Sequence, residues 1–162
     1  MEVTNAISLQ IIHEAMQFKE SECEVLLNGK ATGVKVSGKV LEAAVKVDDV
    51  LYLIFLTDDV VFEESLNIFL IGLGRNNTVV DYASIGAMYS TGMFKNIRIA
   101  SSDSVVFDFM DDVRWKVIVH ASPKLRVPFI NEDKRVARPV GFKRYFSISE
   151  NSSHEKSLNK VN

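Results

Sequence analysis

The chain has 162 residues, the usual size of one domain, and its composition of 47% hydrophobic and 25% charged residues excludes wholesale disorder. No apolar run reaches the roughly 18 residues that a membrane-spanning helix requires, and the first residues lack the features of a signal peptide. A single cysteine, Cys23, cannot form an internal disulfide, which agrees with a reducing compartment. We therefore expect a cytoplasmic protein without a membrane segment.

The net charge of −2 is spread unevenly along the chain. Residues 1–120 hold 10 Lys and Arg against 17 Asp and Glu, whereas residues 121–150 hold 7 against 3. We expect an electrically polar molecule with an acidic body and a basic segment, which could steer charged partners to different faces.

The N-terminal segment fits two interpretations. Apolar residues at Ile7, Ile11 and Ala15 suit a helix, whereas the alternation of Leu9, Ile11 and His13 suits a strand. We favour the strand.

Two hairpins are predicted in the next part of the chain. Asn28-Gly29 suits a type I′ turn, because both central residues of that turn need positive φ angles. Asp48-Asp49 separates the segments Val34–Val47 and Val50–Leu56, which are rich in strand-forming residues, and we expect these segments to pair. Asp59–Leu66 is either a short helix capped by Asp59 or a loop, before a strand that begins at Asn67.

Turn-forming residues recur about every ten residues from Cys23 onward, and apolar residues alternate with polar ones between them. The alternation is clear at Val105, Phe107 and Phe109. This pattern predicts a mainly β fold: an antiparallel β-sandwich or flattened barrel with at most one or two short helices. We expect a single β-rich domain over residues 1–150.

All three prolines lie between Pro123 and Pro139. Because proline removes a backbone donor, residues 122–141 are predicted to form an irregular basic arm that wraps the domain. Phe142–Ile148 alternates again and predicts a last edge strand. Residues 151–162 are polar and without periodicity, so we expect a disordered tail.

No catalytic or nucleotide-binding motif is found in the sequence. Gly29-Lys30 is followed by Ala31 where a P-loop needs Ser or Thr, and Gly72-Leu73-Gly74 lacks the third glycine of a dinucleotide fingerprint. His120 is interpreted as a strand-end or turn residue, and the scattered histidines offer no zinc spacing. We expect no catalytic residue, no metal site and no cofactor.

The candidate binding residues lie in an acidic segment and in a small polar and aromatic segment. Turn aspartates often serve only to bond nearby backbone amides, so a structural role competes with a cation site or a surface that receives a basic protein. The second segment can equally be a bend between strands. The candidates are Asp58, Asp59, Glu63 and Glu64 in the first segment, and Tyr89, Thr91 and Phe94 in the second. A further acidic group is Asp108, Asp111 and Asp112.

The basic arm combines cations, which neutralise phosphates, with aromatic rings, which stack on bases, so nucleic acid is one partner to consider. The chain as a whole is acidic, with a pI near 5.9, and shows no recognisable RNA-binding motif. We therefore expect the arm's cations to pair with the domain's own acidic groups. The residues concerned are Lys124, Arg126, Lys134, Arg135, Arg138, Lys143 and Arg144, interleaved with Phe129, Phe142, Tyr145 and Phe146.

The blocks Leu51–Asp59, Phe62–Glu64, Tyr89–Gly92 and Trp115 resemble those of a small uncharacterised bacterial β-rich family, a likeness that implies no activity. In size, acidic body and lack of catalytic machinery, the chain is also similar to bacterial immunity proteins that neutralise toxins.

The sequence thus predicts a non-enzymatic binding protein, of the toxin-neutralising immunity type, whose partner is another protein rather than nucleic acid or a membrane. One alternative is a β domain that binds a small molecule or a divalent metal, with or without enzymatic activity. Another is a protein that assembles with itself through the Phe142–Ile148 edge.

Overall fold

The computed structural model describes residues 1–14, 16, 21–58, 65–86, 92–110, 113–126 and 133–151. Within these residues the regular structure is made of strands, with no helix and thus no helix that could cross a membrane. The predicted mainly β fold is confirmed. The strands are β1 (Glu2–Val3), β2 (Ile7–His13), β3 (Glu22–Leu27), β4 (Lys30–Ser37), β5 (Val40–Lys46), β6 (Leu51–Thr57), β7 (Leu66–Gly72), β8 (Thr78–Ile85), β9 (Lys95–Ile99), β10 (Ser104–Asp108), β11 (Arg114–Leu125), β12 (Val136–Ala137) and β13 (Lys143–Glu150).

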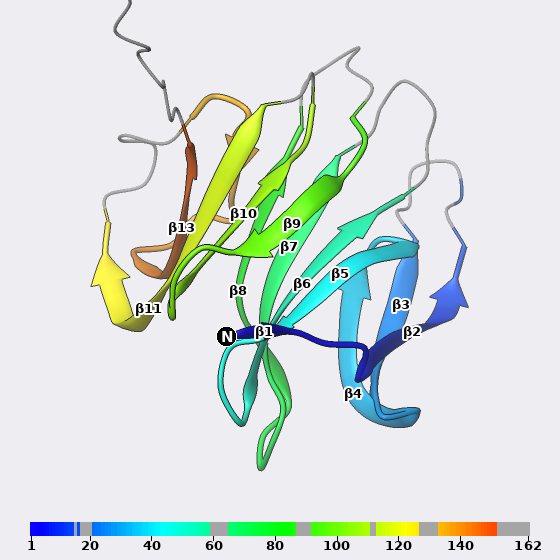
Figure 1. Ribbon diagram of the computed structural model, residues 1–162. Helices are drawn as coiled ribbons and strands as arrows, with labels where there is room; N and C mark the ends of the chain where they lie inside the picture. The colour runs from blue at the N-terminus through cyan, green and yellow to red at the C-terminus, as the bar shows by residue number, and fades with distance from the viewer. Residues whose placement is uncertain are drawn as a thin grey trace, which may run out of the picture.

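The strands form three antiparallel sheets that lie in layers (Figure 1). The central sheet has six strands in the order β1-β5-β6-β7-β8-β12. A four-stranded sheet, β13-β11-β10-β9, packs on one face, and a three-stranded sheet, β2-β3-β4, packs on the other. None of the sheets closes into a barrel, so the sandwich is the alternative that the structure adopts.

The two central strands β6 and β7 are buried along nearly their whole length. Because successive side chains point to opposite faces, Leu53 and Phe55 enter the core under the four-stranded sheet, while Ile54 and Leu56 enter the core under the three-stranded sheet. Because both faces of such a strand are covered, its sequence is a continuous apolar run, as in Leu51–Leu56.

The larger core lies between the central and the four-stranded sheets and contains Trp115, Phe107 and Phe146, all fully buried. The indole Nε1 of Trp115 donates a hydrogen bond to the Phe109 carbonyl at 3.0 Å, which satisfies its one polar group. The ring of Phe107 contacts Phe55 of the central sheet at 5.1 Å between centroids. These aromatic contacts hold the two sheets together.

The two predicted turns and the N-terminal strand are confirmed. The segment Val34–Val47 is not one strand, however: its first residues belong to β4, which pairs with β3, and only β5 pairs with β6. Asn28 and Gly29 adopt φ angles of 50° and 76° in the two-residue turn between β3 and β4. The Asp48 carboxylate accepts hydrogen bonds from the amides of Val50 and Leu51 at 2.8 and 2.9 Å in the turn between β5 and β6. The segment Ile7–His13 is a strand.

The predicted irregular arm is more regular than expected at its ends. Strand β11 continues through Pro123 to Leu125, and the two residues of β12 pair with β8. The predicted last edge strand is confirmed as β13. Residues 59–64, where a helix or a loop was expected, and the tail from residue 152 lie outside the described residues.

The bend between β4 and β5 depends on Gly38, which gives a first prediction. Gly38 has a φ of 121°, and a Cβ atom there would lie 2.7 Å from the Cβ of the buried Leu56. We expect Gly38→Ala to lower the free energy of unfolding by about 2–4 kcal/mol, measured by urea denaturation. Gly29→Asn is the control, because nothing lies within 4 Å of its Cβ position and asparagine tolerates positive φ. Equal losses in the two variants would contradict the steric argument.

Candidate functional site

The structure describes one of the four predicted acidic binding residues. Asp58 follows β6, is half-buried, and accepts a hydrogen bond from the hydroxyl of Ser21, just before β3. Asp59, Glu63 and Glu64 lie outside the described residues. Within the described part of the chain, no group of three or more His, Cys, Asp and Glu side chains could hold a metal ion.

The second acidic group is represented by Asp108, since residues 111 and 112 are outside the described ranges. Its carboxylate accepts hydrogen bonds from Asn96 Nδ2 at 2.7 Å and from Arg114 Nε at 3.0 Å. Burial raises the pKa of Asp108, but the hydrogen bonds from Arg114 and Asn96 outweigh burial, so the pKa lies below its usual value. The geometry gives Asp108 a structural role at the end of β10.

Of the candidates in the second segment, Tyr89 and Thr91 lie outside the described residues, and Phe94 packs against the larger core. The Phe94 ring lies 5.2 Å from the ring of Phe107 and 5.3 Å from that of Phe55. The described candidates Asp58 and Phe94 therefore make separate contacts, one in a hydrogen bond and the other in core packing.

The two potential nucleophile or base residues occupy very different places. Cys23 is fully buried in β3, where burial and the nearby Asp58 carboxylate raise the pKa of its thiol. His120 lies inside β11 rather than at its end, and it lines a hollow of about 210 Å³ beside Asp48 and Asp103. Burial, followed by the positive charges of Lys124 and Arg126, lowers the pKa of His120.

A different surface stands out at the far end of β11. Three large apolar side chains are exposed there: Leu125 by 80%, Val140 by 76% and Phe142 by 66%. Three exposed cations flank them. We call this surface the basic corner, and it consists of Lys124, Leu125, Arg126, Val140, Phe142 and Lys143.

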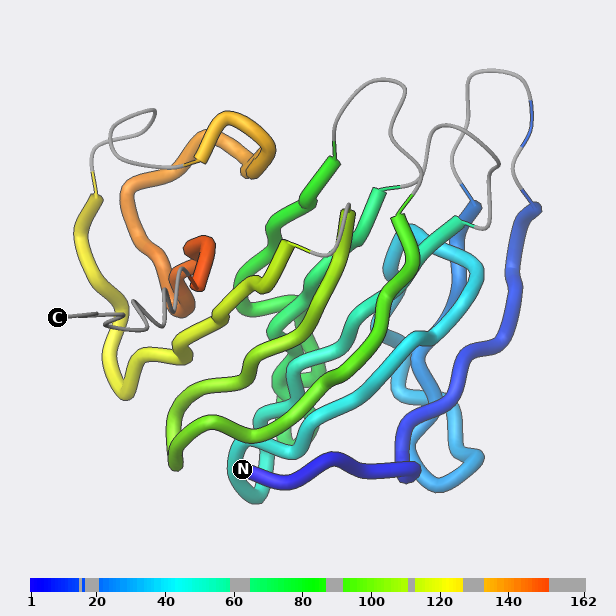
Figure 2. The backbone as a smooth tube through the Cα atoms, turned by 45° about the horizontal axis from the view of Figure 1, so that its top comes forward, coloured from blue at the N-terminus to red at the C-terminus, as the bar shows by residue number. Residues whose placement is uncertain are grey.

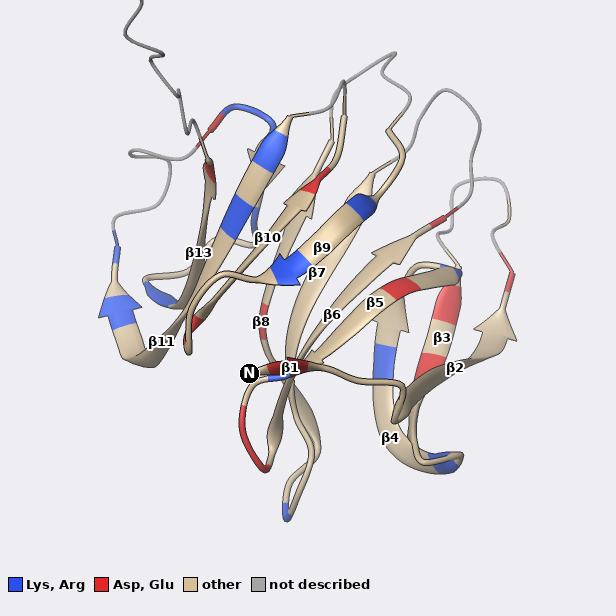
Figure 3. Ribbon diagram, viewed as in Figure 1, with Lys and Arg blue, Asp and Glu red and all other residues tan. Residues whose placement is uncertain are grey.

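The corner is a short two-stranded extension of the four-stranded sheet. Leu125 lies opposite Lys143, and the Arg126 amide donates a hydrogen bond to the Phe142 carbonyl at 2.8 Å. Because directly opposite residues share a face, each face of the extension combines an apolar side chain with a cation. Figure 3 shows blue segments, which mark Lys and Arg, at the end of β11.

Arg144 supports the corner from within. Its guanidinium is buried and donates to the carbonyls of Pro139 at 3.1 Å and Lys143 at 3.3 Å. These bonds hold the turn that carries Val140 and Phe142 against the start of β13. The exposed apolar groups are thus presented on a fixed backbone.

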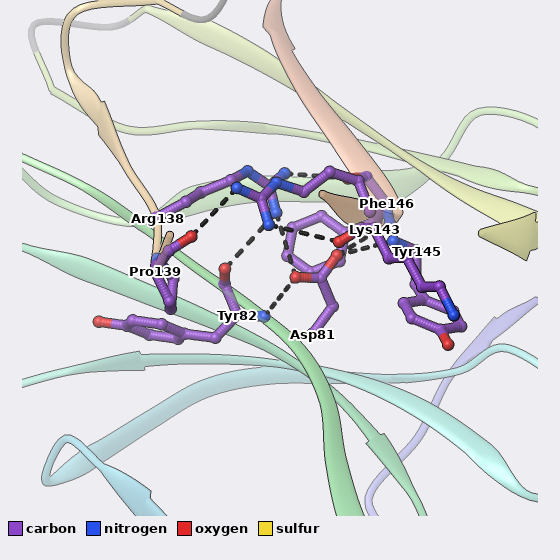
Figure 4. A network of polar contacts seen from close by, with 8 residues as sticks. Asp81, Tyr82, Arg138, Pro139, Lys143, Tyr145 and Phe146 are labelled. Atoms are coloured by element: carbon purple, nitrogen blue, oxygen red, sulfur yellow. Dashed lines mark hydrogen bonds and ion pairs between the residues drawn. The ribbon is translucent and has the colours of Figure 1, made fainter. Parts of the chain in front are cut away.

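A buried ion pair joins β13, the strand that begins at the basic corner, to β8 of the central sheet (Figure 4). Arg138 Nη1 lies 3.4 Å from Asp81 Oδ1, and the two side chains are 1% and 7% exposed. Asp81 Oδ2 accepts a hydrogen bond from the Tyr145 amide at 2.7 Å, and Arg138 Nη2 donates to the Phe146 carbonyl at 2.9 Å. The pair therefore occupies the outer edge of β13 and ties it to β8.

The expectation that the arm's cations pair within the domain holds for Arg135 and Arg138. Arg135 bonds to Asp133 at 2.7 Å and to Glu150 at 2.8 Å, and its guanidinium lies 4.7 Å from the centroid of the Trp115 ring. Its hydrogen bond lowers the pKa of Asp133 to about 2. For the cations of the basic corner, no ion pair is found with any described residue.

The sequence analysis named the cations of the corner but did not predict the exposure of Leu125 and Val140, because exposure depends on where a strand leaves the sandwich. Val117 and Val119 alternate into the core, but burial stops after His120, although β11 continues for five more residues. The sequence feature that indicates this exposure is the loss of alternation from Pro123 onward, where Leu125 stands between Lys124 and Arg126.

Comparison with protein families, with curated proteins and with solved structures finds no match for this chain.

The ion pair between Asp81 and Arg138 gives a second prediction. Asp81→Asn leaves the arginine charge buried without its carboxylate, and breaking a buried pair in this way costs about 3–5 kcal/mol. We expect a loss of that size in the free energy of unfolding, measured by urea denaturation. Glu22→Gln is the control, because the pair of Glu22 with Lys35 is far less buried, with side chains 35% and 60% exposed, and should contribute less than about 1 kcal/mol. Similar losses in both variants would show that the buried pair does not anchor β13.

Proposed function

We propose that this chain is a non-enzymatic binding protein that holds another protein through the basic corner. The observation that carries the proposal is the concentration of exposed Leu125, Val140 and Phe142 on a fixed backbone. Leu125 and Phe142 lie on opposite faces of the two-stranded extension, so a partner would contact both faces. Exposed apolar groups that lie close together mark interaction sites more often than isolated ones do. Burying a leucine or phenylalanine side chain against a partner contributes roughly 1.5–3 kcal/mol.

The flanking charges indicate the chemistry of the partner. Lys124, Arg126 and Lys143 lie beside the apolar groups on the two faces of the extension, so an acidic protein with an apolar cleft that receives the extension would match the corner. Among the described residues from Gly92 to Asn151, 11 are Lys or Arg and 4 are Asp or Glu, which would attract an acidic partner from a distance.

Nucleic acid fits the corner less well than an acidic protein does. Single-stranded nucleic acid is held by several aromatic rings on which bases stack. Phe142 is the one exposed aromatic side chain among the described residues. The Arg138 guanidinium covers Phe146, with its carbon 4.4 Å from the centroid of the Phe146 ring, and Tyr145 is half-buried.

A toxin-neutralising role remains a prediction from the sequence. It would place the contact on the acidic segment after β6, where an acidic surface would cover a basic cleft. Of that segment the structure describes Asp58 alone. The basic corner instead favours an acidic partner, and the two interpretations differ in which substitution weakens binding.

The third prediction tests the corner. The tagged full-length protein is purified from its own host at low salt, the stoichiometric partner is identified, and the dissociation constant is measured by titration calorimetry. Leu125→Ser should weaken binding by roughly 10- to 100-fold, because it removes a buried apolar side chain. Lys124→Glu should weaken binding most at low salt, where charges are least screened.

Met93→Ser is the matched control for Leu125→Ser, because Met93 is 77% exposed and lies away from the corner in sequence. Unchanged affinity in both corner variants, with a loss in Asp58→Asn, would move the contact to the acidic segment. If the host yields no partner and the protein instead sediments with phosphatidylserine vesicles, the corner would be a membrane contact and the proposal would be wrong.

The hollow beside His120 supports a second candidate, the binding of a small molecule. Asp48 and Asp103 supply carboxylates and Leu51 supplies an apolar wall. Its volume of about 210 Å³ is below the usual range of about 300–1,000 Å³ for ligand sites, so only a small cationic ligand would suit it. Thermal-shift screening with small amines would support this candidate if a shift disappears in His120→Ala.

A further inference from the structure

The outer edges of the three sheets differ in how they are protected against pairing with other chains. The edge of β13 is occupied by Asp81 and Arg138 at Tyr145 and Phe146. Strand β9 carries two cations in five residues, and β1 and β12 have two residues each. On β4, the Thr32 carbonyl accepts a hydrogen bond from Asn77 Nδ2 at 2.8 Å. Charges, short strands and covering groups are the usual protections of an edge.

Within the part of the chain that the structure describes, strand β2 has none of these protections over most of its length. It is the outermost strand of the three-stranded sheet and lies at the right-hand margin in Figure 2. The sequence Ile-Ser-Leu-Gln-Ile-Ile-His, from Ile7 to His13, contains no Lys, Arg, Asp or Glu, no proline and no glycine. A bulge after Ile11 is the one irregularity. The stretch Ile7–Ile11 before it is a regular open edge.

The register of the sheet shows which backbone groups face outward. The Asn28 amide donates to the Ala6 carbonyl at 2.7 Å, so Ala6 faces β3. Because the groups of an antiparallel strand alternate in direction, Ser8 and Gln10 also face β3, while Ile7, Leu9 and Ile11 direct their N–H and C=O groups away from it. Among the described residues, no strand other than β3 pairs with β2.

We propose that β2 pairs antiparallel with β2 of a second copy of this chain, about a two-fold axis at Leu9. Each outward N–H then meets an outward C=O, which gives six backbone hydrogen bonds over Ile7–Ile11. Ile7 lies opposite Ile11 of the second copy, and Ser8 lies opposite Gln10. Apolar residues meet apolar ones and polar residues meet polar ones, with no like charges opposed.

Two properties favour a second copy over an unrelated peptide. The strand is complementary to itself in this register, as a two-fold interface requires. Pairing also covers the side chain of Ile11, which is 44% exposed on the face that carries the smaller core. The product is one continuous sheet of six strands, with β4 at both ends, so the assembly closes as a dimer.

The experiment combines sedimentation velocity with hydrogen exchange followed by NMR on the full-length protein, from micromolar to near-millimolar concentration. A pairing of five residues per strand is smaller than a standard interface, so we expect a dimer that dissociates on dilution. The amides of Ile7, Leu9 and Ile11 should become protected as the dimer forms. Those of Ser8 and Gln10 should be protected at every concentration, because they bond to β3.

Ile11→Lys should raise the dimer dissociation constant at least about tenfold, because it places a charge in the pairing edge. Val50→Lys is the matched control, because Val50 is 49% exposed and lies in the turn between β5 and β6. A monomer at the highest concentration, a dimer that Ile11→Lys leaves intact, or protection of the outward amides that does not depend on concentration would each overturn the proposal.

Discussion

Burial of β6 and β7 on both faces is the constraint on which the rest of the molecule depends. An antiparallel sheet usually covers one face and leaves the other to water, but the side chains of these strands are apolar in both directions. Leu53 and Phe55 require the four-stranded sheet as a cover, and Ile54 and Leu56 require a second cover on the opposite side. The small sheet β2-β3-β4 supplies it, and the third layer exists for that reason.

The second constraint is polar, and it decides where the four-stranded sheet ends. Asp81 takes the place of a neighbouring strand by accepting the Tyr145 amide, and Arg138 compensates the buried carboxylate while donating to the next carbonyl. A pair of this kind stabilises a fold little in net terms, because desolvation offsets attraction, but a rearrangement that separates the partners would leave a buried charge uncompensated. Here it fixes the position of β13, and therefore of the extension that carries the basic corner.

The sequence predicted those parts of the fold that local chemistry determines. Asn28-Gly29 and Asp48-Asp49 identified their turns, and the alternation of Val105, Phe107 and Phe109 identified a core strand. The layering could not be predicted, because an apolar run such as Leu51–Leu56 does not say what covers each face. The basic corner could not be predicted either, since the exposure of Leu125 depends on β11 extending past the sandwich. The partnership of Asp81 with Arg138 joins residues far apart in the chain, which periodicity does not reveal.

The two proposed contacts lie on opposite sides of the molecule, with β2 at the right and the ends of β11 and β13 at the left in Figure 1. They can therefore operate together. A dimer joined through β2 would leave both basic corners free and hold them in a fixed two-fold relation, because the joining sheet is continuous. Two corners that engage one acidic assembly would bind it more tightly than either corner alone, since the second contact is made within an existing complex. The weak pairing expected from five residues of β2 would in turn be strengthened by a partner that binds two copies, because the linkage between the two equilibria is reciprocal.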